Sequence, residues 1–357
     1  MVSSPQPTWQ HEGGFIAGPW FDVVAFILAP LFALVLGQAV ALSGWDRVTL
    51  SVGALELGVT STMLRTLIHA HQVAVLVRTH GNPAIFRQFR ARFVLVPAVM
   101  MAAMLGSDRV LATVLVVSVF WDIYHSGMQT FGLCRIYDAL RGNPASVGRA
   151  WDLGLNHVIY VVPMMVGPLV PVQMDIFGTF ATLGDTWFLN MPVKATQAVA
   201  SLRPVLLWGS GLFLVGYAAA WRRLVQRGYE ISTQKLLLLG TTAVACVAAS
   251  GFDVLGQGLL VVNTFHAVQY LALLWHVEGG RVTGRLGLAQ VRSGRMIALL
   301  VLTLLLVMYG VFVGALPGLS GNQTLARVLL VLSSLMTILH FWYDGFVWSV
   351  RKKEAVE

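Results

Sequence analysis

Charged residues are scarce in this 357-residue chain: they make up 11% of it, whereas soluble globular proteins carry about 25%. Hydrophobic residues account for 57%, and the mean hydropathy is +0.73. A chain of this length would ordinarily suggest two soluble domains, but so few charges cannot cover a soluble surface. The composition therefore predicts one all-α integral membrane domain.

Cysteine and the common catalytic signatures are also nearly absent. Cys134 and Cys246 lie inside apolar segments and show no CxxC or zinc-ribbon spacing, which argues against a structural disulfide and an iron–sulfur cluster. No nucleophile elbow and no phosphate-binding loop occurs, which removes serine-hydrolase and P-loop chemistry. The first residues lack a basic n-region and a cleavage signal, so we expect no removable signal peptide.

Hydrophobic segments that are long enough, or nearly so, to span a bilayer recur ten times. They are residues 21–43, 49–77, 91–105, 110–135, 150–172, 204–222, 235–251, 256–276, 296–316 and 325–350. We expect an N-terminal tail over 1–20, a single transmembrane helical domain over 21–350 and a basic tail over 351–357. The longest connection, 173–203, predicts an interfacial hairpin or a short amphipathic piece.

The basic residues lie mostly on one side of the predicted spans. If both termini are cytoplasmic, the inner loops and tail hold eighteen of the 24 Lys and Arg, the outer side holds five, and Arg65 lies within a span. This asymmetry is the positive-inside pattern. It predicts a polytopic bundle of about ten transmembrane helices in a bacterial-type inner membrane, with both termini cytoplasmic. It also accounts for the net charge of +8 without any nucleic-acid partner.

One stretch, residues 117–138, combines a membrane-spanning pattern with polar side chains. Asp122, His125 and Gln129 follow one another at intervals of three and four residues, which stacks them on one helical face. Polar and ionisable groups inside a membrane are costly and mark functional sites by default. We therefore expect this face to point into the protein.

Three other predicted spans carry a histidine at a similar depth. With a rise of about 1.5 Å per residue, His69 lies about 13 Å from the inner boundary, and His125, His266 and His340 lie about 15 Å from it. His71 is shallower, at about 10 Å. A single histidine in a span is often only a hydrogen-bonding link between helices. Four at one depth, on four helices, predict a metal site.

Further polar residues accompany these histidines on their own helices. Arg65 precedes His69 by four residues, Gln269 follows His266 by three and Asp344 follows His340 by four. Carboxylates and amides at such positions are typical partners that orient a metal-ligating imidazole. A set of imidazoles with one or two carboxylates suits iron, copper, nickel or zinc.

The many spans with dispersed histidines resemble the layout of membrane non-haem iron enzymes. In architecture the chain is similar to Brp/Blh-type carotene-cleaving oxygenases and, more remotely, to fatty-acid desaturases and hydroxylases. The tight H-x-x-x-H and H-x-x-H-H boxes of desaturases and alkane hydroxylases do not occur; the close pair His69 and His71 has an i,i+2 spacing that points its rings to nearly opposite faces. The resemblance implies O2-dependent oxidation of a lipid-soluble substrate.

We therefore predict a membrane metalloenzyme of lipid metabolism, an oxygenase- or desaturase-like oxidoreductase that holds one or two non-haem iron ions. Its substrate, an isoprenoid, a carotenoid or a fatty-acyl chain, would enter from the surrounding membrane lipids. The predicted metal ligands are His69, His71, His125, His266 and His340, and the predicted catalytic residues are Asp122, Asp344, Gln129, Gln269 and Arg65. The basic loops 78–92 and 281–295 either dock a soluble redox partner or simply follow from topology.

Three alternatives fit the same residues. His125 and His266 could hold a haem between facing helices in an electron-transfer or haem-handling protein. Asp122 and Asp344, kept protonated, could run acid catalysis in an isoprenoid cyclase or hydratase. The same groups could relay protons in a transporter. A visible spectrum with a metal analysis separates the first alternative from the other two.

Overall fold

The computed structural model describes residues 13–52, 55–181, 190–253, 256–319 and 322–348. Of these described residues, 84% are helical. Among the described residues, six helices are long and apolar enough to cross a membrane, and a bent pair near the N-terminus makes a seventh when it is counted as one span. The predicted class, an α-helical multi-pass membrane protein, is therefore confirmed. Of the two predicted tails, residues 1–12 and 351–357 lie outside the described residues.

The chain packs into two compact units. Unit 1 comprises Met1–Gln38, Val119–His266 and Val350–Glu357, and unit 2 comprises Ala39–Ser118 and Ala267–Ser349. Two long helices contribute residues to both units: α7 (Asp108–Leu140) and α13 (Gly258–Arg285). The expected single membrane domain over 21–350 stays a prediction.

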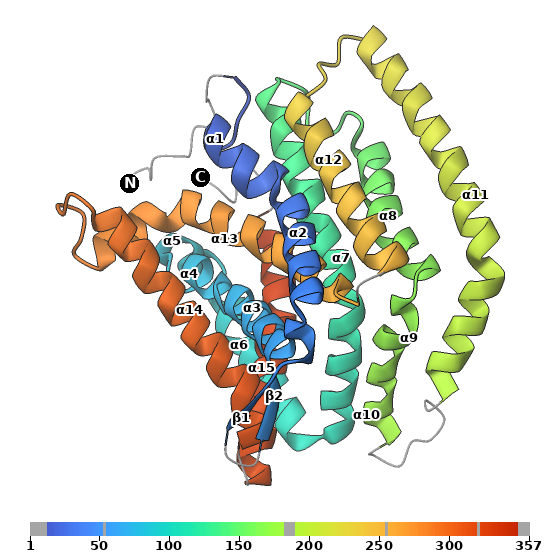
Figure 1. The fold of residues 1–357 in the computed structure, drawn as a ribbon. Coiled ribbons are helices and arrows are strands. Elements are labelled where there is room, and N and C mark those ends of the chain that lie inside the picture. The colour runs from blue at the N-terminus through green and yellow to red at the C-terminus, as the bar shows by residue number, and fades with distance from the viewer. Residues whose placement is uncertain (1–12, 53–54, 182–189, 254–255, 320–321, 349–357) are drawn as a thin grey trace. The chain divides into compact units, whose positions relative to one another are not determined.

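Unit 1 is built from helices (Figure 1). Besides its parts of α7 and α13, its elements are α1 (Pro19–Asp22), the π-helix η1 (Val23–Ile27), most of α2 (Ala29–Ser43), α8 (Arg149–Val166), α9 (Leu169–Met174), the 3₁₀ helix η3 (Asp175–Phe177), α10 (Gly178–Ala181), α11 (Met191–Gln226), α12 (Thr233–Cys246) and the π-helix η5 (Val247–Phe252). Helix α8 packs against both α11 and α12.

The first predicted span is bent rather than straight. Helices α1 and η1 together meet α2 at an angle of 48°. Pro30, which has no N–H to donate, lies in the first turn of α2, so the helical hydrogen bonds restart there. Asp22 fixes the entry to this span, because its carboxylate accepts hydrogen bonds from the backbone N–H of Ile16 at 2.6 Å, the N–H of Ala17 at 2.9 Å and the hydroxyl of Tyr137 at 2.9 Å.

Helix α11 corrects the predicted boundary of the sixth span. The prediction placed residues 173–203 in a connection and began the span at residue 204, but the helix runs from Met191. Pro192 lies in its first turn, where proline is favoured, and Pro204 is accommodated inside the helix. The first part of the connection forms the end of α9, which begins inside the predicted fifth span, and then η3 and α10; residues 182–189 lie outside the described residues.

Unit 2 begins with a small β-hairpin, which corrects the second predicted span. Residues 49–52 and 55–58 are not helical: β1 (Thr49–Val52) pairs antiparallel with β2 (Leu55–Gly58), with Leu50 opposite Leu57. Valine and threonine favour this extended conformation. The helix starts only after Gly58.

The remaining elements of unit 2 are helices. They are the 3₁₀ helix η2 (Trp45–Arg47), α3 (Val59–Val73), α4 (Val75–Thr79), α5 (Pro83–Gln88), α6 (Arg90–Gly106), α14 (Gly294–Leu319) and α15 (Gln323–Val347), with parts of α7 and α13. Helix α15 packs against α3, α4, α6 and α14 (Figure 1).

Helices α3 and α14 approach closely at Gly310. A Cβ atom at Gly310 would lie 2.3 Å from the backbone oxygen of Thr66. We expect Gly310→Ala to destabilise the protein by about 1–3 kcal/mol, because the backbones must separate to admit the methyl group. Thermal unfolding in detergent measures this. Gly209→Ala in α11 is the matched control, because a Cβ at Gly209 meets nothing within 4 Å; equal destabilisation of both variants would contradict the close approach.

Candidate functional site

Two histidines and a carboxylate lie together in unit 2. His71 on α3 packs edge to face against His340 on α15, with ring centroids 5.0 Å apart. Nε2 of His340 lies 3.7 Å from Oδ2 of Asp344, one turn further along α15. Both imidazoles are fully buried. Residues from two separate helices therefore converge on a shared point inside this unit.

The orientation of His71 fixes its tautomer. Nδ1 of His71 lies 3.2 Å from the backbone oxygen of Leu67, one turn earlier in α3. A carbonyl oxygen only accepts, so Nδ1 must carry the proton and donate it. The lone pair is then on Nε2, as a metal-ligating imidazole held by a backbone carbonyl requires.

Tyr270 on α13 joins this group. Its ring centroid lies 4.9 Å from that of His340 and 6.2 Å from that of His71. Its hydroxyl donates to Oδ1 of Asp344 at 3.3 Å. The two oxygens of the Asp344 carboxylate therefore have different partners: Oδ1 accepts from the tyrosine and Oδ2 faces the imidazole of His340. Tyr270 is not among the predicted site residues; its spacing of four from His266 is the signal in the sequence that could have found it.

The predicted residues His69 and Arg65 occupy other faces of α3. His69 is half-buried and interacts with Gln72 on its own helix, and Gln72 accepts a hydrogen bond from Thr337 at 2.8 Å. Arg65 is exposed. Because His69 and His71 are two residues apart, only one of them can face His340; the structure brings His71 there. Gln269 is buried in unit 2.

Unit 1 contains a second pair of histidines. His125 on α7 and His266 on α13 are buried and pack edge to face, with ring centroids 5.0 Å apart. The side-chain amide of Gln129 donates to the backbone oxygen of His266 at 3.0 Å, which ties α7 to α13 beside the pair. Asp122 is half-buried, one turn before His125. The predicted polar face of residues 117–138 therefore carries one buried histidine in contact with another.

Unit 1 also contains a group of four buried charged residues. None of the four is among the predicted site residues. The oxygens Oδ2 of Asp138 and Asp152 each accept from Arg135 at 2.7 Å and from Lys235 at 2.6–2.7 Å. We call these four residues the charge quartet. Tyr217 donates to the other oxygen of Asp152 at 3.0 Å. The quartet joins α7, α8 and α12 at one end of the unit.

The charge quartet is electrically balanced, and both of its cations make further contacts. Nη2 of Arg135 donates to the backbone oxygens of Ala145 and Val147 at 3.0 Å, and Nζ of Lys235 lies 4.3 Å from the ring of Trp221. Burial raises the pKa of the neighbouring Tyr229 phenol, so this hydroxyl stays protonated. Two cations facing two anions leave no net charge for a ligand to neutralise, which indicates a structural role.

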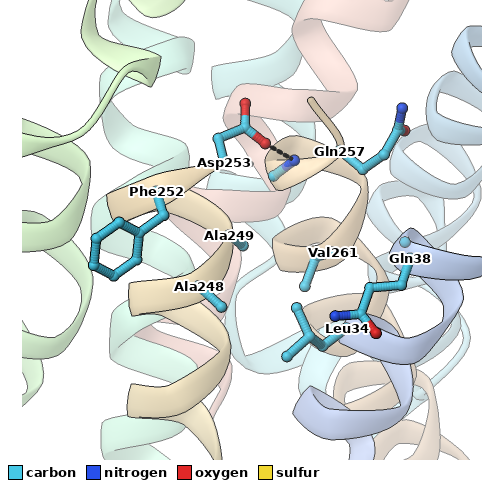
Figure 2. A pocket seen from close by; sticks show the side chains of 10 residues that line it. Leu34, Gln38, Ala248, Ala249, Phe252, Asp253, Gln257 and Val261 are labelled. Atoms are coloured by element: carbon cyan, nitrogen blue, oxygen red, sulfur yellow. Dashed lines mark hydrogen bonds between the residues drawn. The ribbon is translucent and has the colours of Figure 1, made fainter. Parts of the chain in front are cut away.

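A cavity of about 170 Å³ lies elsewhere in unit 1, where α2, η5 and the start of α13 meet (Figure 2). Leu34 and Gln38 line it from α2, and Phe252 lines it from η5. Asp253 has a φ of 39° and its carboxylate accepts from the N–H of Gly258 at 2.8 Å, so it caps α13. No histidine is among the residues that line this cavity, so it is not the predicted metal site.

Comparison of the chain with protein-family models, with curated proteins and with solved structures found no match. The arrangement of the side chains is therefore the basis for assigning a function.

Proposed function

We propose that this protein is a membrane-embedded metalloenzyme that holds non-haem iron through histidines and oxidises a lipophilic substrate such as an isoprenoid, a carotenoid or a fatty-acyl chain. The observation that carries the proposal is the set His71, His340 and Asp344 in unit 2. Two imidazoles and one carboxylate are the ligands that non-haem iron oxygenases use, with coordination positions left open for the reaction.

The surroundings of these three residues fit a metal. The carbonyl of Leu67 holds His71 in the tautomer that presents Nε2 as a ligand. Tyr270 donates to Oδ1 of Asp344 and so holds the carboxylate for ligation through Oδ2. Unit 1 offers His125 and His266 as two further imidazoles. The ligands are therefore sufficient for one or two ions.

Bound iron would supply the redox chemistry of an O2-dependent oxidation. The protein supplies the position and the environment. Tyr270 packs in an apolar cluster with Ala70, Ala74, Leu274 and Leu306, which excludes water from that side of the histidines. A lipophilic substrate can enter from the bilayer without crossing water. The imidazoles and the carboxylate orient the reacting centre.

The geometry of the pair in unit 1 favours direct metal ligation over the haem alternative. Two axial histidines must lie on opposite faces of a porphyrin. The rings of His125 and His266 instead touch edge to face, with centroids 5.0 Å apart at an interplanar angle of 81°, which leaves no space for a porphyrin between them.

Elemental analysis with a visible spectrum, on the detergent-purified protein and on a His125→Ala variant, tests the proposal. We expect the wild type to contain iron in stoichiometric amount without a Soret band. We expect a lower iron content in the variant. The ratio of iron to protein gives the number of ions. A Soret band would replace the proposal with the haem alternative. No bound metal after loading would overturn it in favour of acid catalysis or proton transport, with Asp344 as the first residue to replace.

We expect Tyr270→Phe to weaken iron binding by about 10–100-fold, the usual effect of losing an outer partner of a metal ligand. The substitution removes the hydroxyl that donates to Asp344 and keeps the ring that packs against His340. The measurement is iron affinity by competition with a chelator. Tyr343→Phe is the matched control, because Tyr343 is also fully buried in unit 2 and packs on Phe93 and His80 rather than on His71 and His340. Equal affinities of both variants and the wild type would contradict the role of Tyr270.

The proposal includes ten membrane crossings with both termini cytoplasmic in a bacterial-type inner membrane. Its support is the number of apolar helices. To the seven spans counted above, three shorter helices can be added: α3 with 15 residues, α6 with 17 and α8 with 18. Each coincides with a predicted hydrophobic segment. Reporter fusions at the two termini test the orientation; a periplasmic signal from either one would contradict it.

A further inference from the structure

Exposed arginines gather on unit 2. Seven of them lie in two stretches, residues 78–92 and 276–295, and all are solvent-accessible; we call them the arginine face: Arg87, Arg90, Arg92, Arg281, Arg285, Arg292 and Arg295. They belong to the ends of α5, α6, α13 and α14 and to the connection between α13 and α14.

Contacts within unit 2 hold these helix ends together. The guanidinium of Arg92 lies 5.2 Å from the ring of Phe346, near the end of α15. The guanidinium of Arg295, at the start of α14, lies 5.8 Å from the ring of Trp275 on α13. Arg78 in α4 bonds to Glu278 in α13 at 2.9 Å. The ends of these helices therefore lie on one side of the unit.

The charge of the arginine face is not neutralised by the two stretches that carry it. Residues 78–92 contain no carboxylate, and residues 276–295 contain only Glu278. Glu278 is 1% exposed and already accepts from Arg78, Arg281 and Asn82. Apart from Arg281, which pairs with Glu278, the guanidiniums of the arginine face therefore have no carboxylate partner within these two stretches.

In unit 1, some of the basic residues are buried and paired with carboxylates. Arg135 and Lys235 are buried and paired in the charge quartet. The exposed arginines of the 222–235 stretch are Arg222, Arg223 and Arg227, and an exposed glutamate, Glu230, follows them. The positive-inside tendency explains the sign of the charge in both units, but it does not explain why only unit 2 leaves so much charge exposed.

We propose that the arginine face binds the headgroups of anionic phospholipids. Exposed apolar side chains follow the arginines directly: Val94 and Leu95 come after Arg92 in α6, and Met296 and Ile297 come after Arg295 in α14. A phospholipid offers a phosphate to the guanidiniums and an acyl chain to these side chains. A soluble acidic protein would leave the apolar side chains uncovered, so a lipid matches both halves of the surface.

Native mass spectrometry of the detergent-solubilised full chain tests this inference, with dioctanoyl phosphatidylglycerol, dioctanoyl phosphatidylcholine and inorganic phosphate as probes. We expect the wild type to prefer phosphatidylglycerol. The double variant Arg90→Gln/Arg92→Gln should bind it about 25-fold more weakly, since each arginine near an anionic surface contributes roughly fivefold. The matched control, Arg222→Gln/Arg223→Gln in unit 1, removes two exposed arginines and should keep the wild-type affinity.

Three outcomes would overturn the inference. Equal affinities for phosphatidylglycerol and phosphatidylcholine would show that the face does not recognise anionic lipid and would favour an acidic protein partner. Equal losses in both double variants would show a general effect of charge. Inorganic phosphate binding as tightly as phosphatidylglycerol would reduce the surface to a phosphate site. All four substituted side chains are exposed, so each variant should fold and remain monodisperse.

Discussion

Replacing His340 by alanine is expected to abolish stoichiometric iron binding by the purified protein. His340 is fully buried, contacts His71 and lies 3.7 Å from Asp344, so it is the residue that links the other two proposed ligands. Loss of a direct ligand should exceed the 10–100-fold effect that is typical of an outer partner. Elemental analysis after size-exclusion chromatography measures the loss, and activity on a lipid substrate should fall with it.

Two further variants separate loss of a ligand from loss of fold. His340→Gln retains most of the side-chain volume and should also lose iron, although its cavity is smaller than that of the alanine variant. His157→Ala removes a half-buried histidine of α8, whose Nδ1 bonds to its own helix at Leu153, and should keep the wild-type iron content. Iron retained in both His340 variants would exclude this residue as a ligand.

Lys235→Met is expected to destabilise the protein by about 3–5 kcal/mol, the usual effect of removing one partner of a buried ion pair. The lysine ammonium is fully buried and donates to both Asp138 and Asp152. Without it, two buried carboxylates share the single guanidinium of Arg135. Thermal unfolding in detergent should show the largest decrease among the single substitutions of unit 1.

Two control variants follow from the balance of charges in the quartet. Asp138→Asn combined with Lys235→Met again leaves one cation facing one anion, so the double variant should be more stable than Lys235→Met alone. Lys194→Met, at an exposed position of α11, should change the stability by less than about 1 kcal/mol. A double variant that is less stable than both single variants would argue that the lysine acts through its packing on Trp221 rather than through its charge.

Hydropathy predicted the helices better than it predicted their ends. Each of the ten apolar segments contains a helix, because burying the backbone of such a segment in lipid requires internal hydrogen bonds. Local chemistry decided the rest. Residues 49–58 are apolar enough to be counted in a span, yet residues 49–52 pair with residues 55–58 as strands, and α11 continues through Pro204. Neither event changes the average hydropathy on which the prediction depends.

Glycine shows the same limit. Closely spaced glycines such as Gly209 and Gly211 favour close helix packing in membrane proteins, but a side chain at either position would meet nothing within 4 Å. The close approach occurs at Gly310 instead. A glycine permits contact on whichever face a neighbouring helix lies, and the sequence of one helix does not reveal that face.

Direction around a helix could not be predicted from the sequence. The spacing along the helices predicted one layer for His125, His266 and His340 and ranked His69 above His71. The difference in depth between these two is about 3 Å, and their directions differ by about 200°. The direction toward His340 depends on how α3 packs against α15. The charge quartet was not predicted for a related reason. Its four members come from separate segments, and only Arg135 and Asp138 are close in sequence.

The charge quartet can be completed only late in the synthesis of the protein. Asp138 and Asp152 enter the membrane with α7 and α8, but Lys235 follows 97 and 83 residues later. Until α12 leaves the ribosome, the nascent chain holds two carboxylates against one arginine. An unfinished chain that stops before α12 therefore keeps an uncompensated acidic group at its helix ends. Such a chain should therefore be less stable than a chain that includes α12, in which the network is complete.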